Sequence, residues 1–451
     1  MILVSRRVAL PDGVRAASVH VAGGVITDVR GVAEVPPGAA VLDVGDLVLM
    51  PGLVDTHVHI NDPGRVTWEG FDTATRAAAA GGVTTLVDMP LNSIPPTTTL
   101  LGLEAKAKAA EGRLMVDVGF CAGLVPESVG SLRALWDAGA IAFKCFLAES
   151  GVPEFSHVEA ADLEAGMREL AGFGAPLFVH AELPGPLARA AAAQEAKGAI
   201  DPRTYASWLD ARPREAEDEA IDLVIRLSKD TGARAHVVHL SSATALSAIR
   251  RAKDAHAPFS AETCPHYLTF ASEEIPDGAT EYKCAPPIRG AKNRDQLWDA
   301  LRERLLDQVV TDHSPSTAEL KCSGSGDFVK AWGGIASLQL GLAAVWTNAR
   351  ARGATIADMV DWMCAGPARL VGLEHKGRIA KGAAADLVVW DPDGDFAVDV
   401  MRLEHKNKVT PYHGRRLTGR VLETWLGGEK IYDRGAFTAP PHGRWLKRGA
   451  R

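Results

Sequence analysis

Short apolar segments, each followed by a stretch of helical composition, fill the middle of the chain. The segments between them carry the Ala, Leu, Glu and Arg content of helices, for example at 71–80, 103–112, 132–138, 160–171, 215–228 and 244–253. The apolar segments are interpreted as strands, at residues 52–57, 83–89, 115–120, 141–144, 177–180, 235–239, 259–262 and 309–312. Eight strands alternating with helices predict an α/β fold, a (β/α)8 TIM-like barrel over residues 51–377, with its chemistry at the C-terminal strand ends.

The two ends of the chain follow a different pattern, with short alternating strands and tight turns. Residues 18–22 and 25–29 flank Gly23-Gly24, which predicts a hairpin. Similar stretches return at 385–390 and 419–432. Because chain termini often lie close together, residues 1–50 and 378–440 are expected to form one small β-domain with a structural role, leaving 441–451 as a C-terminal tail.

Composition narrows the class of protein. A chain of 451 residues with 47% hydrophobic and 23% charged residues fits a soluble globular protein with one large barrel and a smaller module. The net charge of −7 shows no basic stripe, so neither nucleic acid nor an anionic membrane is an expected partner. Neither a signal peptide nor an apolar run of about 18 residues is apparent, and a cytoplasmic location is expected. The six cysteines form no Cys-x-x-Cys pair and predict reduced, mostly buried thiols.

His57 and His59 lie at the end of the first predicted barrel strand. Residues i and i+2 of a strand point to the same face, so both imidazoles are directed to one point. At the C-terminal mouth of a barrel this pair is half of a metal site. A lone His-x-His pair can also be coincidental, so the other strands must supply further ligands.

Further candidate ligands end other predicted strands. Each has an ordinary interpretation alone: a satisfied core histidine, a lysine reaching solvent, or an aspartate capping a turn. It is improbable that all of these residues gather at the same rim of one barrel by coincidence. The candidates that join His57 and His59 are Lys144, His180, His239 and Asp312.

The sixth strand contains two histidines three residues apart, His236 and His239. On a regular strand they face opposite sides, so only one is expected to enter the barrel. His239 is nearer the C-terminal end and is assigned as the ligand, whereas His236 is given a structural role.

Lys144 needs a separate hypothesis because an ammonium group has no lone pair for a metal. Burial near positive charge lowers the pKa of a lysine, and the neutral amine can react with CO2 to give a carbamate that bridges two metals. His57, His59 and Asp312 then hold one ion, and His180 and His239 the other. Two such ions lower the pKa of a bridging water and polarise a substrate carbonyl, while Asp312 transfers the proton. That chemistry is amide or phosphoester hydrolysis.

These motifs together resemble the cyclic amidase branch of the amidohydrolase superfamily, which contains hydantoinases, dihydropyrimidinases, dihydroorotases and allantoinases. The resemblance covers nearly the whole chain. It implies N6-carboxylysine at Lys144, two divalent metal ions that are usually zinc, a small β-sandwich domain at the termini, and a homo-oligomer, often a tetramer. The motifs are His-Val-His at 57–59, Phe-Lys-Cys-Phe at 143–146, His-Ala-Glu at 180–182, His-Leu-Ser-Ser at 239–242, Cys-Pro-His-Tyr at 264–267, Cys-Ala-Pro-Pro-Ile-Arg at 284–289 and Thr-Asp-His-Ser-Pro at 311–315.

Smaller features favour the allantoinase group within that branch. Dihydroorotases typically carry Arg two residues after the second His of the pair, where this chain has Asn61. Hydantoinases usually place a Tyr shortly after the modified lysine, where this chain has Phe-Leu-Ala-Glu at 146–149. The segments 62–65, 68–70, 89–92 and 331–336 are also similar to allantoinases. The resemblance thus implies opening of the hydantoin ring of allantoin, a small-molecule substrate of purine degradation, to give allantoate.

Loops at the strand ends supply candidate substrate contacts: Asn92, the Cys284 backbone, Ser314 and Trp332. Each has an equally ordinary interpretation as a turn residue, loop, cap or core aromatic. His266 and Arg289 are interpreted as structural, and the Ser- and Gly-rich segment 321–327 as a mobile lid.

Two alternatives stay open at this point. A hydantoinase or dihydropyrimidinase would use the same ligands on a related ring. A non-catalytic scaffold relative would have lost ligands, and all six positions are filled here.

Overall fold

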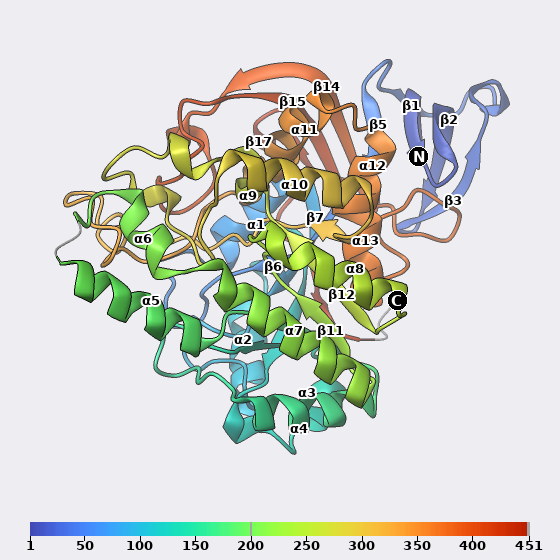
Figure 1. The fold of residues 1–451 in the computed structure, drawn as a ribbon. Coiled ribbons are helices and arrows are strands. Elements are labelled where there is room, and N and C mark those ends of the chain that lie inside the picture. Colours follow the sequence, from blue (N-terminus) through green and yellow to red (C-terminus); the bar gives the residue numbers. More distant parts are fainter. Residues whose placement is uncertain (199–200, 449–451) are drawn as a thin grey trace.

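The computed structural model describes residues 1–198 and 201–448, which are organised around two β-sheets (Figure 1). The strands of one sheet are parallel and pair in chain order, β6 to β13. An isolated parallel bridge between Val58 and His313 joins the two ends of this sheet. The expected (β/α)8 barrel is therefore confirmed. Its strands are β6 (Leu53–Val58), β7 (Val83–Asp88), β8 (Asp117–Gly123), β9 (Ala142–Phe146), β10 (Pro176–His180), β11 (Arg234–Val237), β12 (Phe259–Thr263) and β13 (Gln308–Val309).

Helices cover the outside of the barrel, and each expected helical segment overlaps one of them. In α7, buried Ala220, Ile221, Val224 and Ile225 recur at helical spacing and face the core, and Gly232 ends the helix with a left-handed φ of 74°. The helices are α1 (Phe71–Ala80), α2 (Leu100–Ala110), α3 (Leu132–Asp137), α4 (Ala160–Ala171), α5 (Pro184–Lys197), α6 (Tyr205–Ala211), α7 (Arg214–Thr231), α8 (Leu246–Asp254), α9 (Pro265–Thr269), α10 (Ala291–Arg302), α11 (Gly341–Ala351), α12 (Ile356–Val360) and α13 (Gly366–Leu370).

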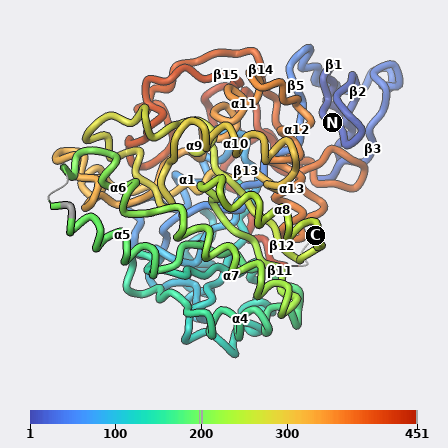
Figure 2. The backbone as a smooth tube through the Cα atoms, in the orientation of Figure 1, coloured from blue at the N-terminus to red at the C-terminus, as the bar shows by residue number. Residues whose placement is uncertain are grey.

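The second sheet combines strands from both ends of the chain, as the matching terminal patterns predict. β5 pairs antiparallel with β14, and Figure 2 shows these blue and orange segments next to each other. The predicted hairpin is present, with Gly23 and Gly24 at φ of 58° and 79°, as a two-residue turn with positive φ requires. The strands are β1 (Ile2–Leu10), β2 (Gly13–Ala22), β3 (Val25–Arg30), β4 (Val41–Asp43), β5 (Val48–Pro51), β14 (Leu387–Ala397), β15 (Arg416–Leu426), β16 (Glu429–Asp433) and β17 (Ala436–Phe437).

Both faces of β14 are buried over residues 387–390, which are all apolar. Leu387 and Val389 pack into the core of the terminal β-domain, whereas Val388 and Trp390 pack into the core of the barrel. Across the same junction, the buried Lys376 ammonium contacts Asp117 Oδ2 at 2.8 Å and Asp386 Oδ2 at 2.6 Å. The terminal domain is thus fixed to the barrel by packing and by a buried ion triad.

The structure also bears on the expectations for the C-terminal segment, the cysteines and membrane-spanning helices. In the segment expected as a tail, Trp445–Leu446 forms β18 and pairs with β8, while residues 449–451 lie outside the described residues. The domain boundaries at 50, 377 and 440 stay predictions. All six cysteines are free, five of them buried and Cys322 partly exposed. Within the described residues, no helix has the length and apolar character needed to cross a membrane.

Candidate active site

The first barrel strand brings His57 and His59 to one carboxylate. The Nε2 atoms of these histidines lie 3.3 Å and 3.5 Å from Asp312 Oδ1. Asp312 follows β13, has a left-handed φ of 45°, and lines the same cavity as both histidines. Ligand atoms of the three residues all lie within 4.8 Å of one another. The structure thus joins three residues from opposite ends of the barrel sequence into one potential metal-holding group.

His180 and His239 form a second pair beside the first. His180 Nδ1 lies 3.0 Å from His239 Nε2, and the ring centroids of His239 and His57 are 5.4 Å apart. Burial lowers the pKa of His59 to about 4, and burial also lowers the pKa values of His180 and His239. The imidazoles therefore stay neutral near pH 7 and keep a lone pair for a metal ion.

Lys144 extends from β9 into the same space. Its side chain is fully buried, and among the described residues Nζ has no hydrogen-bond partner. Burial lowers the pKa of the Lys144 ammonium to about 8, although the carboxylates of Asp312 and Glu262 act in the opposite direction. A buried, unpaired amine is costly, so this nitrogen fits a position where another group binds or reacts.

Glu262 holds His57 in place, and sequence reasoning missed it. This buried carboxylate accepts hydrogen bonds from His57 Nδ1 at 2.7 Å and from His236 Nε2 at 2.9 Å. Burial alone would raise the pKa of Glu262, but these hydrogen bonds outweigh it and lower the pKa to about 2. A glutamate inside an apolar predicted strand was the available sign, since such a residue is rarely buried without partners.

The expectation that only one of His236 and His239 enters the barrel is wrong. His236 points inward to Glu262, while His239 reaches the site from beyond the end of β11, with a left-handed φ of 41°. Side-chain alternation applies only within the regular strand, so it does not set the direction of His239.

A second missed carboxylate, Glu182, orients His180. Glu182 Oε2 accepts a hydrogen bond from His180 Nε2 at 2.8 Å, and the guanidinium of Arg212 donates to both carboxylate oxygens. Burial would raise the pKa of Glu182, but the charge of Arg212 and the hydrogen bond from His180 lower it to about 2. The carboxylate therefore stays ionised and fixes His180 with Nδ1 facing His239.

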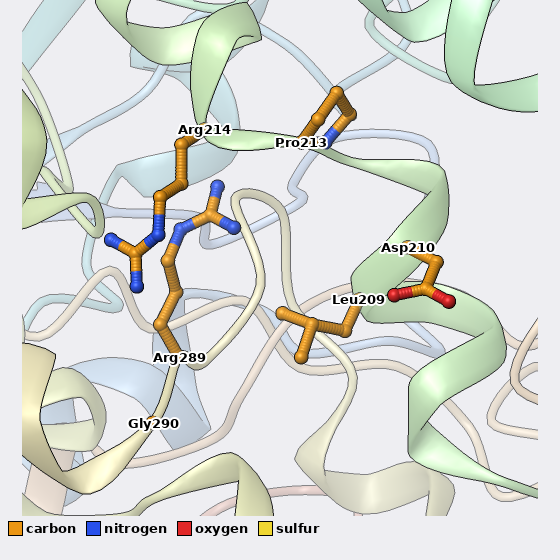
Figure 3. Close-up of a pocket in the computed structure, with 6 residues that line it drawn as sticks. All are labelled: Leu209, Asp210, Pro213, Arg214, Arg289 and Gly290. Atoms are coloured by element: carbon orange, nitrogen blue, oxygen red, sulfur yellow. The ribbon is translucent and has the colours of Figure 1, made fainter.

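Arg289 has the structural role expected for it. Its guanidinium donates to Glu217 Oε1 at 2.7 Å, and Glu217 Oε2 accepts the backbone N–H groups of Ser241 and Ser242 at 3.0 Å each. These contacts hold the loop that follows His239. Arg289 and Arg214 lie beside each other (Figure 3) and line a separate pocket of about 350 Å³, to which none of the site histidines contributes.

All six predicted ligands line one cavity of about 240 Å³. Asn92, Ser314 and Trp332 also line it, and Ser314 Oγ donates to Asp312 Oδ1 at 2.9 Å. Among the described residues, Ala285 lines this cavity but the predicted contact Cys284 does not. The Cys284 carbonyl accepts the indole N–H of Trp208 at 2.8 Å.

Loops that flank the pair His57 and His59 support the cavity wall. Arg65 donates to the backbone carbonyl of Asn92 at 3.0 Å, and Trp68 packs against Trp332 with ring centroids 4.9 Å apart. Lys321 is buried and donates to the carbonyl of Trp332 at 3.0 Å. The proposed lid movement of 321–327 stays a prediction.

Comparison with known proteins points to one group of hydrolases. Residues 48–430 match the model of the amidohydrolase family. The chain is 54% identical to the allantoinase of Streptomyces avermitilis over 449 residues, which cover 99% of this chain and 98% of that protein. It is 42% identical to the allantoinase of Arabidopsis thaliana, over 96% of this chain and 88% of the relative.

Solved structures show the same fold over the whole chain. The L-hydantoinase (dihydropyrimidinase) from Arthrobacter aurescens superposes with a TM-score of 0.93 at 30% identity, over 99% of both chains. A D-hydantoinase (dihydropyrimidinase) from Thermus sp. superposes with a TM-score of 0.89 at 28% identity, again over 99% of both chains.

Proposed function

This chain belongs to the amidohydrolase family and is 54% and 42% identical to two allantoinases over nearly its whole length, so we propose that it hydrolyses the cyclic amide of allantoin to allantoate. Water adds to a ring carbonyl carbon, the adjacent ring carbon–nitrogen bond breaks, and the nitrogen leaves with a proton. The observation that carries the proposal is that the six strand-end residues His57, His59, Lys144, His180, His239 and Asp312 line one cavity.

The donor set fits divalent metal ions, and zinc is the ion proposed. Because His57 Nδ1 donates to Glu262, its Nε2 lone pair faces Asp312 Oδ1 across 3.3 Å. Two electron-rich atoms in that position favour a cation between them, and imidazole nitrogen with carboxylate oxygen is a usual zinc environment. His57, His59 and Asp312 would hold one ion, and His180 and His239 the other.

Lys144 is proposed to carry N6-carboxylysine. The neutral amine would attack CO2, a nitrogen–carbon bond would form, and a proton would be released to solvent. The carboxylate formed would bridge the two ions. Supporting this, the Lys144 amine is buried and has no partner among the described residues, and burial lowers its pKa to about 8.

Bound ions would lower the pKa of a water molecule and polarise the substrate carbonyl. Proton transfer is assigned to a side chain of the protein itself. Asp312 would accept the proton of the attacking water and pass it to the leaving ring nitrogen. Burial alone would raise the pKa of Asp312, yet that pKa lies well below its usual range, so the carboxylate is ionised and able to accept.

Around this centre, polar loop groups are proposed to hold the imide and the ureido group of allantoin. Asn92 Oδ1 is buried and has no partner in the described part of the chain, which leaves it available to an N–H of the ring. Ser314, which lines the cavity, would contribute a further hydrogen bond, whereas a contact from the Cys284 backbone stays a prediction. The indole of Trp332 would form a wall against the flat ring.

A hydantoinase or dihydropyrimidinase is the second candidate, since the solved structures that superpose on this chain have those activities in their names. The segment 146–149 favours allantoin instead, and the allantoinases named above have higher sequence identity to this chain than these two structures have. A scaffold role is disfavoured because every ligand position is filled.

A substrate panel tests the proposal. Values of kcat/KM on allantoin, hydantoin and dihydrouracil are measured with one preparation of the metal-loaded enzyme, and the Asp312→Asn variant controls for contaminating activity. Allantoin is expected to have the highest value. A preference for dihydrouracil would contradict the assignment.

Two further expectations come with the family. A homotetramer is proposed, and light scattering of the purified chain measures its mass in solution. The cytoplasmic location stays a prediction, which fluorescence microscopy of the tagged chain in its native cell would test.

A further inference from the structure

Cys264 and His266 form a second group of metal-ligating side chains with Asp312. Both residues follow β12, with Cys264 directly before α9 and His266 inside it. The Cys264 thiol, a ring nitrogen of His266 and a carboxylate oxygen of Asp312 all lie within 4.8 Å of one another, and all three residues are buried. Among the described residues that line the cavity, Asp312 is present but Cys264 and His266 are not. The hydrolysis proposed above therefore uses neither.

The hydrogen-bonding state of His266 is the unusual feature. The residue is fully buried, yet neither Nδ1 nor Nε2 has a partner among the described residues. Its ring packs edge-on against Tyr267, but the Tyr267 hydroxyl donates elsewhere, to the Pro286 carbonyl at 2.7 Å. A buried polar atom without a partner destabilises the fold. A ligand that accepts the lone pair of His266 would remove part of that destabilisation.

The nearby His313 shows what a purely structural histidine looks like in this protein. It is equally buried, but its Nε2 lies 3.3 Å from Glu69 Oε2 and its Nδ1 accepts the backbone N–H of Ser337 at 3.2 Å. Both nitrogens of His313 are therefore used. The contrast indicates that His266 is placed for a ligand other than the surrounding protein.

We propose that Cys264, His266 and Asp312 form an inhibitory zinc site, separate from the two ions of the catalytic centre. A thiolate, an imidazole and a carboxylate are zinc ligands, whereas magnesium and calcium prefer oxygen ligands alone. As the zinc–sulfur bond forms, the thiol loses its proton to solvent. An ion would reach the site along Asp312, which borders the cavity.

Occupation of this site inhibits hydrolysis by engaging Asp312. A lone pair of its carboxylate is then shared with the inhibitory ion and cannot accept the proton of the attacking water. This effect rests on the proposed function, because it requires Asp312 to transfer that proton. Binding of the ion does not depend on the proposed function, so the two are measured separately.

Binding is tested with Co²⁺ added to the zinc-loaded enzyme, because thiolate–Co²⁺ bonds give a charge-transfer absorption band and the proposed catalytic ligands include no sulfur. The wild type should show the band, and Cys264→Ser should lose it. Cys322→Ser is the matched control, since Cys322 is the most exposed of the thiols and the first to capture an adventitious ion. Absence of the band in the wild type, or its persistence in Cys264→Ser, overturns the site.

Inhibition is tested by assaying allantoin hydrolysis against rising zinc. Cys264→Ser and His266→Gln should each raise the concentration that halves activity by more than about tenfold, since loss of even an outer ligand partner weakens metal affinity about 10–100-fold. His266→Gln decides the question if Cys264→Ser fails to fold. Equal inhibition of the wild type and both variants overturns the inhibitory role. A wild type that shows the band but hydrolyses no allantoin refutes the proposed function and not the site.

Discussion

Replacing Glu262 with Gln should weaken metal binding without removing any proposed ligand. The substitution keeps the shape of the side chain but converts one acceptor oxygen into a donor. Three donors converge on the native carboxylate, from His57 at 2.7 Å, His236 at 2.9 Å and Gln308 at 2.8 Å. A carboxamide cannot accept from all of them. If its NH2 group faces His57, the ring proton moves from Nδ1 to Nε2, where the proposed metal requires the lone pair.

The size of the effect follows from the chemistry of such partners. Loss of a carboxylate that orients a metal-bound histidine typically costs 10–100-fold in metal affinity or activity, or about 1.4–2.7 kcal/mol. The loss caused by Glu262→Gln should lie in the upper part of this range, because Glu262 is fully buried and its hydrogen bonds are charge-assisted. The substitution leaves the His57 side chain present, so the expected effect comes from a changed tautomer and orientation of the His57 ring.

The assay is zinc affinity by competition with a chromophoric chelator, together with kcat/KM on allantoin. Glu423→Gln is the matched control, because Glu423 is also a buried carboxylate, 4% exposed, but lies in β15 of the terminal sheet. That variant should bind zinc like the wild type. If Glu262→Gln also binds zinc and hydrolyses allantoin like the wild type, Glu262 does not control His57 and the reasoning is refuted.

Three further predictions concern the site and its support. Asp312→Asn should lower kcat on allantoin by about 10²–10⁴ with an unchanged circular dichroism spectrum, and near-normal turnover would exclude Asp312 as the proton carrier. Lys376→Met leaves the buried carboxylates of Asp117 and Asp386 without their cation and should cost about 3–5 kcal/mol in denaturant unfolding. Lys253→Met, at the partly exposed pair with Asp307, should cost less than about 1 kcal/mol, and equal losses would show that burial is not decisive. Because burial lowers the pKa of His59 to about 4 from 6.5, the unfolded chain binds a proton that the metal-free native state does not, and this group should remove about 3 kcal/mol of stability as pH falls from 6.5 to 4. Unfolding curves of metal-free protein that do not change across that range would contradict the last prediction.

The positions of the candidate ligands could be predicted from the sequence because barrel geometry is general. Once eight strands were recognised, their C-terminal ends had to meet at one rim, and Lys144 in β9 and His180 in β10 are there. The terminal β-domain was predictable for the same kind of reason, since a Gly-Gly hairpin turn and alternating strands are local patterns.

The groups that orient those ligands could not be predicted, because they depend on contacts between distant parts of the chain. His57 and Glu262 are 205 residues apart in sequence, and no local pattern pairs them. Arg212 likewise reaches Glu182 from the end of α6, 30 residues away. His239 adopts a left-handed backbone conformation that residues other than glycine rarely use, so strand alternation gave the wrong expectation for this pair of histidines.

The metal content of the purified chain, measured by mass spectrometry alongside activity on allantoin, tests the central claim most directly. The wild type is expected to hold about two divalent ions per chain, and Lys144→Ala, which cannot form the bridging carbamate, should lose at least one ion together with most of its activity. One ion or none per chain in a fully active wild type, or a Lys144→Ala variant with unchanged metal content and activity, would contradict the proposed two-metal centre.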